Sequence, residues 1–157
     1  MFSILILTIG IPASGKTTWV NEYRKSYPQA HVVSTDELRK EITGTKNCDP
    51  RQNDLIHDEA RKRVKQILDD PNNYGGNNGM GPIIIVDSTN VDFVEWIKYK
   101  MLGASIMCAK VFDLSPTQAM ERQKNRERKV PMEILQMKWD SFQKNKHHIQ
   151  HIFNMIL

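Results

Sequence analysis

The distribution of hydrophobic positions predicts that strands and helices alternate along the whole chain. Residues 4–9 and 83–87 are almost uninterrupted apolar runs, which is typical of parallel strands buried on both faces. We expect two further strands at 31–34 and 105–112. Apolar residues recur at helical spacing elsewhere, and we expect helices over 17–26, 34–43, 51–68, 91–102, 116–126 and from 131 onward. This alternation predicts a three-layer α/β fold with a parallel four-stranded sheet and helices on both faces.

The sequence also predicts where some helices begin and which faces they bury. Ser34 and Glu37 have the spacing of a capping box, and Gly44 is placed to end the short helix that follows. The helix over 91–102 carries an apolar stripe formed by Phe93, Ile97 and Met101. The last helix carries a stripe formed by Leu135, Trp139 and Phe142. We expect both stripes to face the core.

The length of 157 residues is that of one domain, and we expect residues 1–157 to form a single unit. The apolar run at 4–9 is far shorter than the ~18 residues of a membrane span, and it lacks the features of a signal peptide. Cys48 and Cys108 form no metal-binding pattern, so we expect free thiols in a cytoplasmic protein. Residues 71–82 are rich in Gly, Asn and Pro, which predicts a surface loop.

The basic surplus lies in the last third of the chain. Lys and Arg number 22 against 18 Asp and Glu, a net charge of +4. Residues 1–109 hold thirteen charges of each sign, whereas residues 110–157 hold nine basic and five acidic side chains. Residues 121–129 alone hold five basic and two acidic ones. A local basic patch of this kind indicates an anionic partner.

Residues 10–17 match the phosphate-binding pattern G-x-x-x-x-G-K-[ST] in full, after a predicted strand and before a predicted helix. Its glycines let backbone N–H groups converge on phosphate oxygens at a helix N-terminus. Lys16 is placed to reach the β- and γ-phosphates, and Thr17 to offer its hydroxyl to Mg²⁺. The expected nucleotide-binding residues of the loop are Gly10, Pro12, Ala13, Ser14, Gly15, Lys16, Thr17 and Thr18.

The loop predicts ATP or another NTP as the phosphate donor, with Mg²⁺, and leaves the acceptor open. The chain contains no N-K-x-D motif, which a GTPase would use to recognise its base. Its small size favours a kinase that acts on small acceptors or on a nucleic-acid end.

Polar residues follow the second predicted strand. Asp36 and Arg39 are three positions apart in the first turn of a predicted helix, so they share one face. In phosphoryl transfer, such a carboxylate orients and deprotonates the attacking hydroxyl while the arginine binds a nearby anion. The alternative is a helix start with a local surface ion pair.

A second polar group ends the third predicted strand. Asp87 is placed to hold the Mg²⁺ shell through water, and Thr89 and Asn90 are placed to line the acceptor site. The alternative is that Ser88 or Thr89 caps the next helix.

Arginines dominate the basic patch. Arg122 and Arg126 are four positions apart, so we expect them on one helix face, where they would embrace the triphosphate. Together with Arg128 they fall in residues 121–131, between two predicted helices, where a mobile lid would lie. The alternative is an ordinary solvated basic face.

Taken in order, these motifs resemble the P-loop polynucleotide 5′-hydroxyl kinases, such as the kinase domain of the phage polynucleotide kinase–phosphatase. The resemblance rests on residues 6–16, Asp36-x-x-Arg39, residues 87–90 and 111–113, and Arg122-x-x-x-Arg126 followed by Val130-Pro131. It implies transfer of the γ-phosphate of ATP or another NTP to a 5′-hydroxyl of DNA or RNA, in bacterial or phage-infected cytoplasm. By position, Lys16 and Thr17 take the triphosphate and Mg²⁺, Asp36 acts as general base, Arg39 binds the acceptor's adjoining phosphate, and Arg126 belongs to the lid.

The chain departs from that family pattern in three places. The phosphatase half is absent, so we expect no processing of 3′ ends. The spacing over residues 87–89 differs by one residue, and the gap between Arg126 and Pro131 is shorter. Three alternatives stay open: a kinase of hydroxymethyluracil in DNA, a small-metabolite kinase, and a nucleotide-dependent switch without chemistry.

Overall fold

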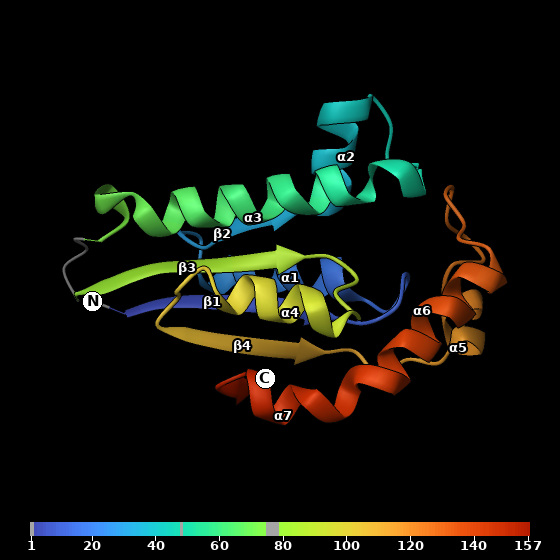
Figure 1. The fold of residues 1–157 in the computed structure, drawn as a ribbon. Coiled ribbons are helices and arrows are strands. Elements are labelled where there is room, and N and C mark those ends of the chain that lie inside the picture. The colour runs from blue at the N-terminus through green and yellow to red at the C-terminus, as the bar shows by residue number, and fades with distance from the viewer. Residues whose placement is uncertain (1, 48, 75–78) are drawn as a thin grey trace.

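The computed structural model of the chain describes residues 2–47, 49–74 and 79–157 and contains one parallel sheet (Figure 1). Its strands are β1 (Phe2–Ile9), β2 (His31–Ser34), β3 (Met80–Asp87), β4 (Ile106–Val111) and β5 (Met155–Ile156). They lie in the order β2-β3-β1-β4-β5, and every neighbouring pair is parallel. Cys48 and the middle of the predicted 71–82 loop lie outside the described residues.

The α/β fold is confirmed, but the sheet has five strands where the sequence predicts four. The additional strand, β5, has only two residues, which pair with Cys108 and Ala109 of β4. Two residues show no periodicity, and their pairing depends on a strand more than forty positions away, so no local pattern indicates this strand.

Helices fill the segments between the strands much as predicted. They are α1 (Lys16–Ser26), α2 (Thr35–Thr43), α3 (Asn53–Asp69), α4 (Phe93–Lys100), α5 (Pro116–Arg122), α6 (Met132–Asn145) and α7 (Ile149–Ile152), with 3-10 turns at Pro50–Gln52, Pro71–Asn73 and Lys146–His148. The predicted start of α2 is confirmed, because the Ser34 hydroxyl accepts a hydrogen bond from the Glu37 N–H. Gly44 ends α2 with a φ of 80°, a left-handed conformation that glycine adopts without strain.

Among the described residues, none of these helices combines the length and the apolar character needed to cross a membrane.

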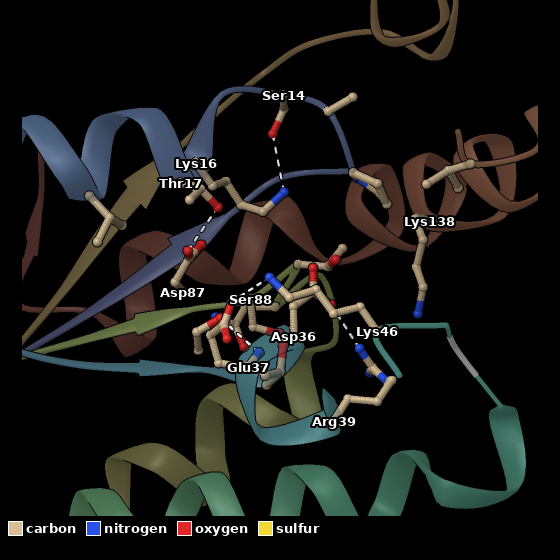
Figure 2. A pocket seen from close by; sticks show the side chains of 18 of the residues that line it. Ser14, Lys16, Thr17, Asp36, Glu37, Arg39, Lys46, Asp87, Ser88 and Lys138 are labelled. Carbon is tan, nitrogen blue, oxygen red and sulfur yellow. Dashed lines mark hydrogen bonds and ion pairs between the residues drawn. The ribbon is translucent and has the colours of Figure 1, made fainter. Parts of the chain in front are cut away.

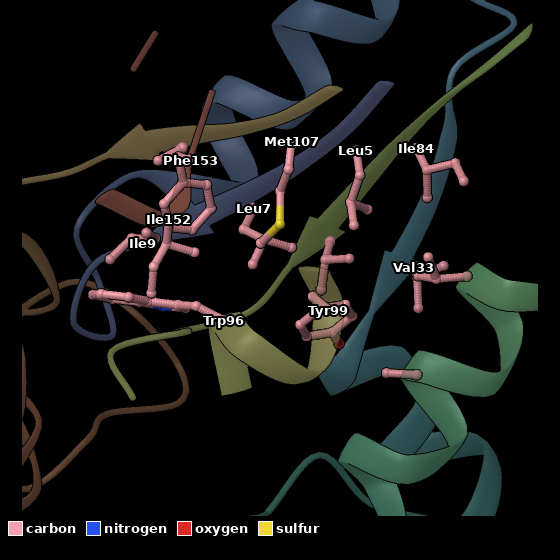
Figure 3. Packing of buried hydrophobic residues seen from close by; sticks show 14 of the residues in the cluster. Leu5, Leu7, Ile9, Val33, Ile84, Trp96, Tyr99, Met107, Ile152 and Phe153 are labelled. Atoms are coloured by element: carbon pink, nitrogen blue, oxygen red, sulfur yellow. The ribbon is translucent and has the colours of Figure 1, made fainter. Parts of the chain in front are cut away.

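The sheet is covered on both faces, as the apolar strands predict. Alternate residues of β1 point to opposite sides, so Leu5 and Leu7 pack in the larger core with residues of α3, α4, α6 and α7 (Figure 3). Ile6 points the other way and packs with Val20 of α1. A third small cluster joins the segment after β1 to α5 and α6, through Ile11, Ala13, Ala119 and Leu135.

The buried face of α4 differs from the prediction. Trp96 and Tyr99 are fully buried, whereas Met101, of the predicted stripe, is 80% exposed. The Trp96 indole donates a hydrogen bond of 2.6 Å to the Asn90 carbonyl and packs against Phe153 of the chain end. Burying two large aromatic side chains removes more apolar surface from water than burying the stripe of Phe93, Ile97 and Met101. The stripe predicted for α6 is confirmed, since Leu135 and Phe142 are buried.

The carboxyl ends of β1, β2 and β3 meet at one edge of the sheet, close to α5 and α6 (Figure 1). β1 lies between β3 and β4. After β1, the next two strands, β2 and β3, lie on one side of it, and the following strand, β4, lies on the other side. In open parallel sheets, ligands bind at the carboxyl edge where the strand order reverses in this way.

Candidate active site

The phosphate-binding loop follows β1 and leads into α1, as its sequence context predicts. The Gly10 N–H donates a hydrogen bond of 3.0 Å to the Thr89 carbonyl, which ties the loop to the end of β3. A Cβ atom on Gly10 would lie 2.7 Å from the Ser14 hydroxyl and 2.9 Å from the Phe112 carbonyl, so no larger residue fits there. The loop then turns through two left-handed residues, Ala13 at φ 64° and Gly15 at φ 97°.

Lys16 is buried at the start of α1, with its ammonium turned back into the loop (Figure 2). Its Nζ donates hydrogen bonds to the Ile11 carbonyl at 2.6 Å and to the Ser14 hydroxyl at 3.4 Å. Burial lowers the pKa of Lys16 to about 8, although the carboxylates of Asp87 and Asp36 act in the opposite direction. Those two acids therefore lie within electrostatic reach of the loop lysine.

Thr17 and Asp87 form the strongest candidate for a metal site. The Thr17 hydroxyl donates a hydrogen bond of 2.8 Å to Asp87 Oδ2 (Figure 2). Burial raises the pKa of Asp87, while the Thr17 hydrogen bond and the Lys16 charge lower it. A hydroxyl and a carboxylate beside a phosphate-binding loop are the oxygen donors that Mg²⁺ takes together with phosphates and water, so the residues present fit this ion.

The described residues contain no cluster of three or more His, Cys, Asp or Glu side chains that could hold a metal alone. A magnesium ion at Thr17 and Asp87 would therefore share its coordination with a bound nucleotide.

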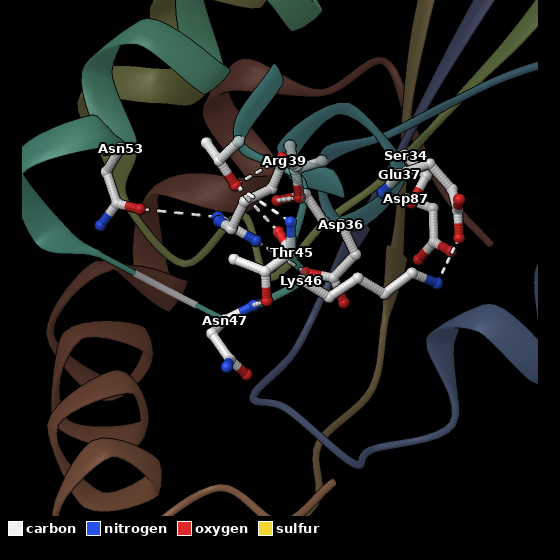
Figure 4. Close-up of polar contacts among 12 residues, drawn as sticks. Ser34, Asp36, Glu37, Arg39, Thr45, Lys46, Asn47, Asn53 and Asp87 are labelled. Atoms are coloured by element: carbon white, nitrogen blue, oxygen red, sulfur yellow. Dashed lines mark hydrogen bonds and ion pairs between the residues drawn. The ribbon is translucent and has the colours of Figure 1, made fainter. Parts of the chain in front are cut away.

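Asp36 and Arg39 form the ion pair that their spacing predicts (Figure 4). Arg39 is buried, and its Nη1 donates a hydrogen bond of 2.8 Å to Asp36 Oδ1. Arg128 of the basic patch approaches the other carboxylate oxygen at 3.6 Å. The Asp36 side chain is still 54% exposed, so its carboxylate is oriented by two arginines and remains accessible from the cavity.

The sheet places Asp36 and Asp87 side by side. In the parallel pairing of β2 with β3, Ser34 lies opposite Asp87. One residue further along each chain, the Thr35 hydroxyl donates a hydrogen bond of 3.0 Å to the Ser88 hydroxyl. This buried bridge connects the first turn of α2 to the end of β3 and so fixes the carboxylates relative to each other.

Thr89 and Asn90 line the turn between β3 and α4. The alternative that Ser88 or Thr89 caps α4 is wrong, because Asp92 accepts the capping hydrogen bond from the Val94 N–H. Asn90 adopts a left-handed φ of 46°, and its buried amide donates a 2.9 Å hydrogen bond to the Thr8 carbonyl. Its amide thus holds the turn against β1, and a role in acceptor binding stays a prediction for both residues.

The two lid arginines do not share a helix face, contrary to the prediction. α5 ends at Arg122, and Arg126 lies in the exposed loop that follows. Arg122 donates a hydrogen bond of 3.2 Å to the Ser14 carbonyl, so it contacts the phosphate-binding loop directly. Arg126 lines the cavity in front of that loop, and its charge contributes to lowering the Lys16 pKa.

The side chain of Gln123 explains why the helix stops there. Its amide donates a hydrogen bond of 2.6 Å to the Val130 carbonyl and accepts one of 2.9 Å from the Val130 N–H. Gln123 is only 2% exposed. The two bonds therefore join the two ends of residues 123–130 through a buried side-chain amide, and the segment between them forms a closed loop. We call this segment the lid loop, and it carries both Arg126 and Arg128.

The predicted residues converge on one cavity of about 980 Å³. Those that line it are Pro12, Ala13, Ser14, Gly15, Lys16, Thr17, Thr18, Asp36, Arg39, Asp87, Thr89, Asn90 and Arg126. Gly10 and Arg122 do not line it. Gly10 begins the loop and bonds the Thr89 carbonyl, and Arg122 contacts the loop backbone.

Part of the cavity wall was not predicted from the sequence. We call this wall the α3/α6 side after the helices that supply most of it; its residues are Asn53, Asp54, His57, Ile134 and Lys138, together with Glu95 of α4. One signal was available, since Lys138 lies next to Trp139 and three positions after Leu135, on the inward side of a predicted helix. The others come from separate helices whose packing no local pattern indicates.

A family model described as an AAA domain (AAA_33) matches residues 5–147. A chain of the Pnkp1/Rnl/Hen1 RNA repair complex has a TM-score of 0.72 at 20% identity, covering 93% of this chain and 46% of that one. A gluconokinase from Sinorhizobium meliloti 1021 has a TM-score of 0.63 at 13% identity, covering 96% and 79%. Shikimate kinase from Acinetobacter baumannii, in complex with shikimate, has a TM-score of 0.58 at 9% identity, covering 100% and 83%. The protein therefore spans less than half of the repair-complex chain, and identities this low show a shared fold alone.

Proposed function

Because the chain belongs to the AAA domain family and has a P-loop kinase fold, we propose that it is a polynucleotide 5′-hydroxyl kinase. It transfers the γ-phosphate of ATP or another NTP to a 5′-hydroxyl of DNA or RNA. The observation that carries this proposal is the position of Asp36, held by Arg39 and Arg128 between the phosphate-binding loop and the α3/α6 side of the cavity. A carboxylate there is able to receive the proton of an acceptor hydroxyl.

In an in-line phosphoryl transfer, each of these cavity residues has a separate role. Lys16 and Arg126 bring positive charge to the γ-phosphoryl group, where negative charge spreads during the reaction. Asp36 orients the hydroxyl and takes its proton, and Arg39 holds the acid in place. Thr17 and Asp87 would hold Mg²⁺, which neutralises phosphate charge when it is bound.

Two further observations favour a nucleic-acid acceptor. The basic lid loop closes one side of the cavity, as expected for a partner that carries several phosphates. The structural similarity to a chain of an RNA repair complex covers nearly the whole protein.

The direct test is incubation with γ-labelled ATP, Mg²⁺ and a panel of DNA and RNA oligonucleotides with 5′-hydroxyl ends. We expect label at the 5′ end and a loss of about 10²- to 10⁴-fold in Asp36→Asn, with ATP binding retained. Glu37→Gln is the matched control, because this neighbouring carboxylate is exposed and pairs with Lys46. Absence of label on every DNA and RNA end would contradict the proposal.

A small-molecule kinase is the second candidate, since gluconokinase and shikimate kinase share this fold. It predicts transfer to small hydroxyl compounds and indifference to oligonucleotides. Salt separates the two candidates, because affinity for a nucleic acid falls steeply as the salt concentration rises. Label at internal hydroxymethyluracil, with none at 5′ ends, would instead identify a kinase of modified bases.

A further inference from the structure

The two oxygens of the Asp36 carboxylate are not equally available. Oδ1 accepts the 2.8 Å hydrogen bond from Arg39, a buried arginine of the same helix (Figure 4). Oδ2 lies 3.6 Å from Nη1 of Arg128, which belongs to the lid loop. Because Arg39 engages Oδ1, Oδ2 is the oxygen left to take the proton of a hydroxyl, and Arg128 lies over it.

The contact between Arg128 and Oδ2 is easily broken. Its length exceeds that of a hydrogen bond, and it joins side chains that are 41% and 54% exposed. Exposed ion pairs are weak and are screened by salt, whereas the Arg39 guanidinium is buried. An acceptor hydroxyl bound in the cavity is therefore able to displace Arg128 from Oδ2 while Arg39 keeps the carboxylate in place.

The nearby lysines of the cavity are engaged elsewhere. Lys46 pairs with the exposed carboxylate of Glu37. The Lys16 ammonium is turned into the phosphate-binding loop, where it bonds loop oxygens. Within the part of the chain that the structure describes, the ion-pair contacts thus place Arg128, and no lysine, on Oδ2 of Asp36.

The lid loop brings one arginine toward the phosphate-binding loop and another toward the acid. Arg126 lies within electrostatic reach of Lys16, whose pKa is lowered by burial and, to a lesser degree, by that charge. Arg128 lies at Asp36. Val130, two positions after Arg128, packs against the small cluster formed by the segment after β1, α5 and α6. This anchor keeps the Arg128 side chain within reach of the acid.

A general base beside bound ATP is also able to activate water. In that uncoupled reaction a water oxygen bonds to the γ-phosphorus, the bond to the bridging oxygen breaks, ADP leaves with the electron pair, and the water proton passes to Asp36. A cation over Oδ2 occupies the position that this proton must reach. A bound acceptor has other contacts that hold its hydroxyl against the acid, and water has none, so the acceptor displaces the cation far more effectively.

We propose that Arg128 is a specificity-determining residue that discriminates the acceptor hydroxyl from water, because it covers Oδ2 of Asp36 until an acceptor displaces it. This inference rests on the part of the proposed function that makes Asp36 the general base. It goes beyond that function by assigning to the lid loop the suppression of ATP hydrolysis in the absence of an acceptor.

Hydrolysis of ATP without any acceptor tests the inference. Phosphate release from γ-labelled ATP is measured at saturating ATP with Mg²⁺, for the wild type and for Arg128→Gln. We expect release to rise by about two- to fivefold in Arg128→Gln, because a weak ion pair covers Oδ2 for most but not all of the time. Damage to folding or to ATP binding would lower phosphate release, so it gives the opposite sign.

Three variants and a salt series locate the effect. Lys129→Gln removes the neighbouring charge of the lid loop, an exposed lysine that does not line the cavity, and should behave as the wild type. Arg128→Lys keeps a cation at this position and should retain most of the suppression. In an Asp36→Asn background, Arg128→Gln should change nothing, because the carboxylate that the arginine covers is gone. Added salt should raise release by the wild type and leave Arg128→Gln unchanged.

Unchanged or lower phosphate release in Arg128→Gln would overturn the inference, as would an equal rise in Lys129→Gln or a rise that persists with Asp36→Asn. The labelling of 5′-hydroxyl ends reports separately on the proposed function. Asp36-dependent release that rises in Arg128→Gln, with no label on any DNA or RNA end, keeps the role of Arg128 and contradicts the polynucleotide acceptor. Labelled ends with unchanged release in Arg128→Gln keep the proposed function and remove the role of Arg128.

Discussion

The amide of Gln123 bonds both backbone groups of Val130 and so closes the lid loop, and we infer that it thereby keeps Arg126 at the cavity. Gln123→Met keeps most of the side-chain volume and removes both hydrogen bonds to Val130. Each bond contributes about 0.5–1.5 kcal/mol net, so the closed loop loses about 1–3 kcal/mol. That corresponds to a population shift of about 5- to 150-fold toward an open loop.

We expect kcat for phosphoryl transfer to fall by up to this factor in Gln123→Met, because the population of the closed loop falls by at most the change in the equilibrium. KM should stay nearly unchanged, because Arg126 acts on the transition state. Steady-state transfer to a 5′-hydroxyl acceptor at saturating ATP measures the effect, and urea unfolding checks that the variant folds. Gln136→Met is the control, since Gln136 is exposed and bonds only Asp140, at 2.9 Å.

The decisive comparison repeats Gln123→Met in an Arg126→Ala background. If the Gln123 amide acts through Arg126, adding Gln123→Met to Arg126→Ala lowers kcat little further, because the arginine that the amide positions is already gone. An equal drop in both backgrounds would refute this reasoning. An unchanged kcat together with a lower urea midpoint would refute it too, because Gln123 would then stabilise the fold without positioning Arg126.

The remaining predictions concern the nucleotide and the metal. Because the pKa of Lys16 is about 8, the ammonium that attracts phosphate is present below pH 8 and lost above it, so ATP affinity should be flat up to pH 8 and then fall by about tenfold per pH unit. Nucleotide titrations from pH 6.5 to 9.5 measure this trend, and a decline that persists in Lys16→Ala would contradict it. Asp87→Asn should raise the Mg²⁺ concentration for half-maximal activity by about 10- to 100-fold, with Asp92→Asn, the exposed cap of α4, as control. An unchanged Mg²⁺ requirement would remove Asp87 from the metal site.

Features encoded over a few neighbouring residues were predictable. The phosphate-binding loop is a fixed spacing between a strand and a helix, and the ion pair of Asp36 with Arg39 lies within one helical turn. The order of elements follows from runs and stripes of apolar residues that any compact α/β fold must bury.

Features decided by distant contacts were not predictable. α5 stops at Arg122 because the Gln123 side chain bonds Val130, seven positions away, and helical spacing contains no sign of this. α4 has apolar side chains on more than one face, and packing against the chain end selects Trp96 over Met101. Lys138 of α6 lines the same cavity as residues of α2 and α3, which are far from it in the sequence, so only the folded chain brings them together.

The pairing of β2 with β3 has a consequence for how changes in length would act on this protein. Ser34 lies opposite Asp87, and two residues later Asp36 is already on the first turn of α2. One residue inserted between Ser34 and Asp36 would swing the carboxylate by about 100° around the helix axis while every side chain kept its identity. The position of the Asp36 carboxylate therefore depends on the backbone register after β2 as much as on residue type. Shifting that register by one residue would inactivate the site although every residue of it is still present.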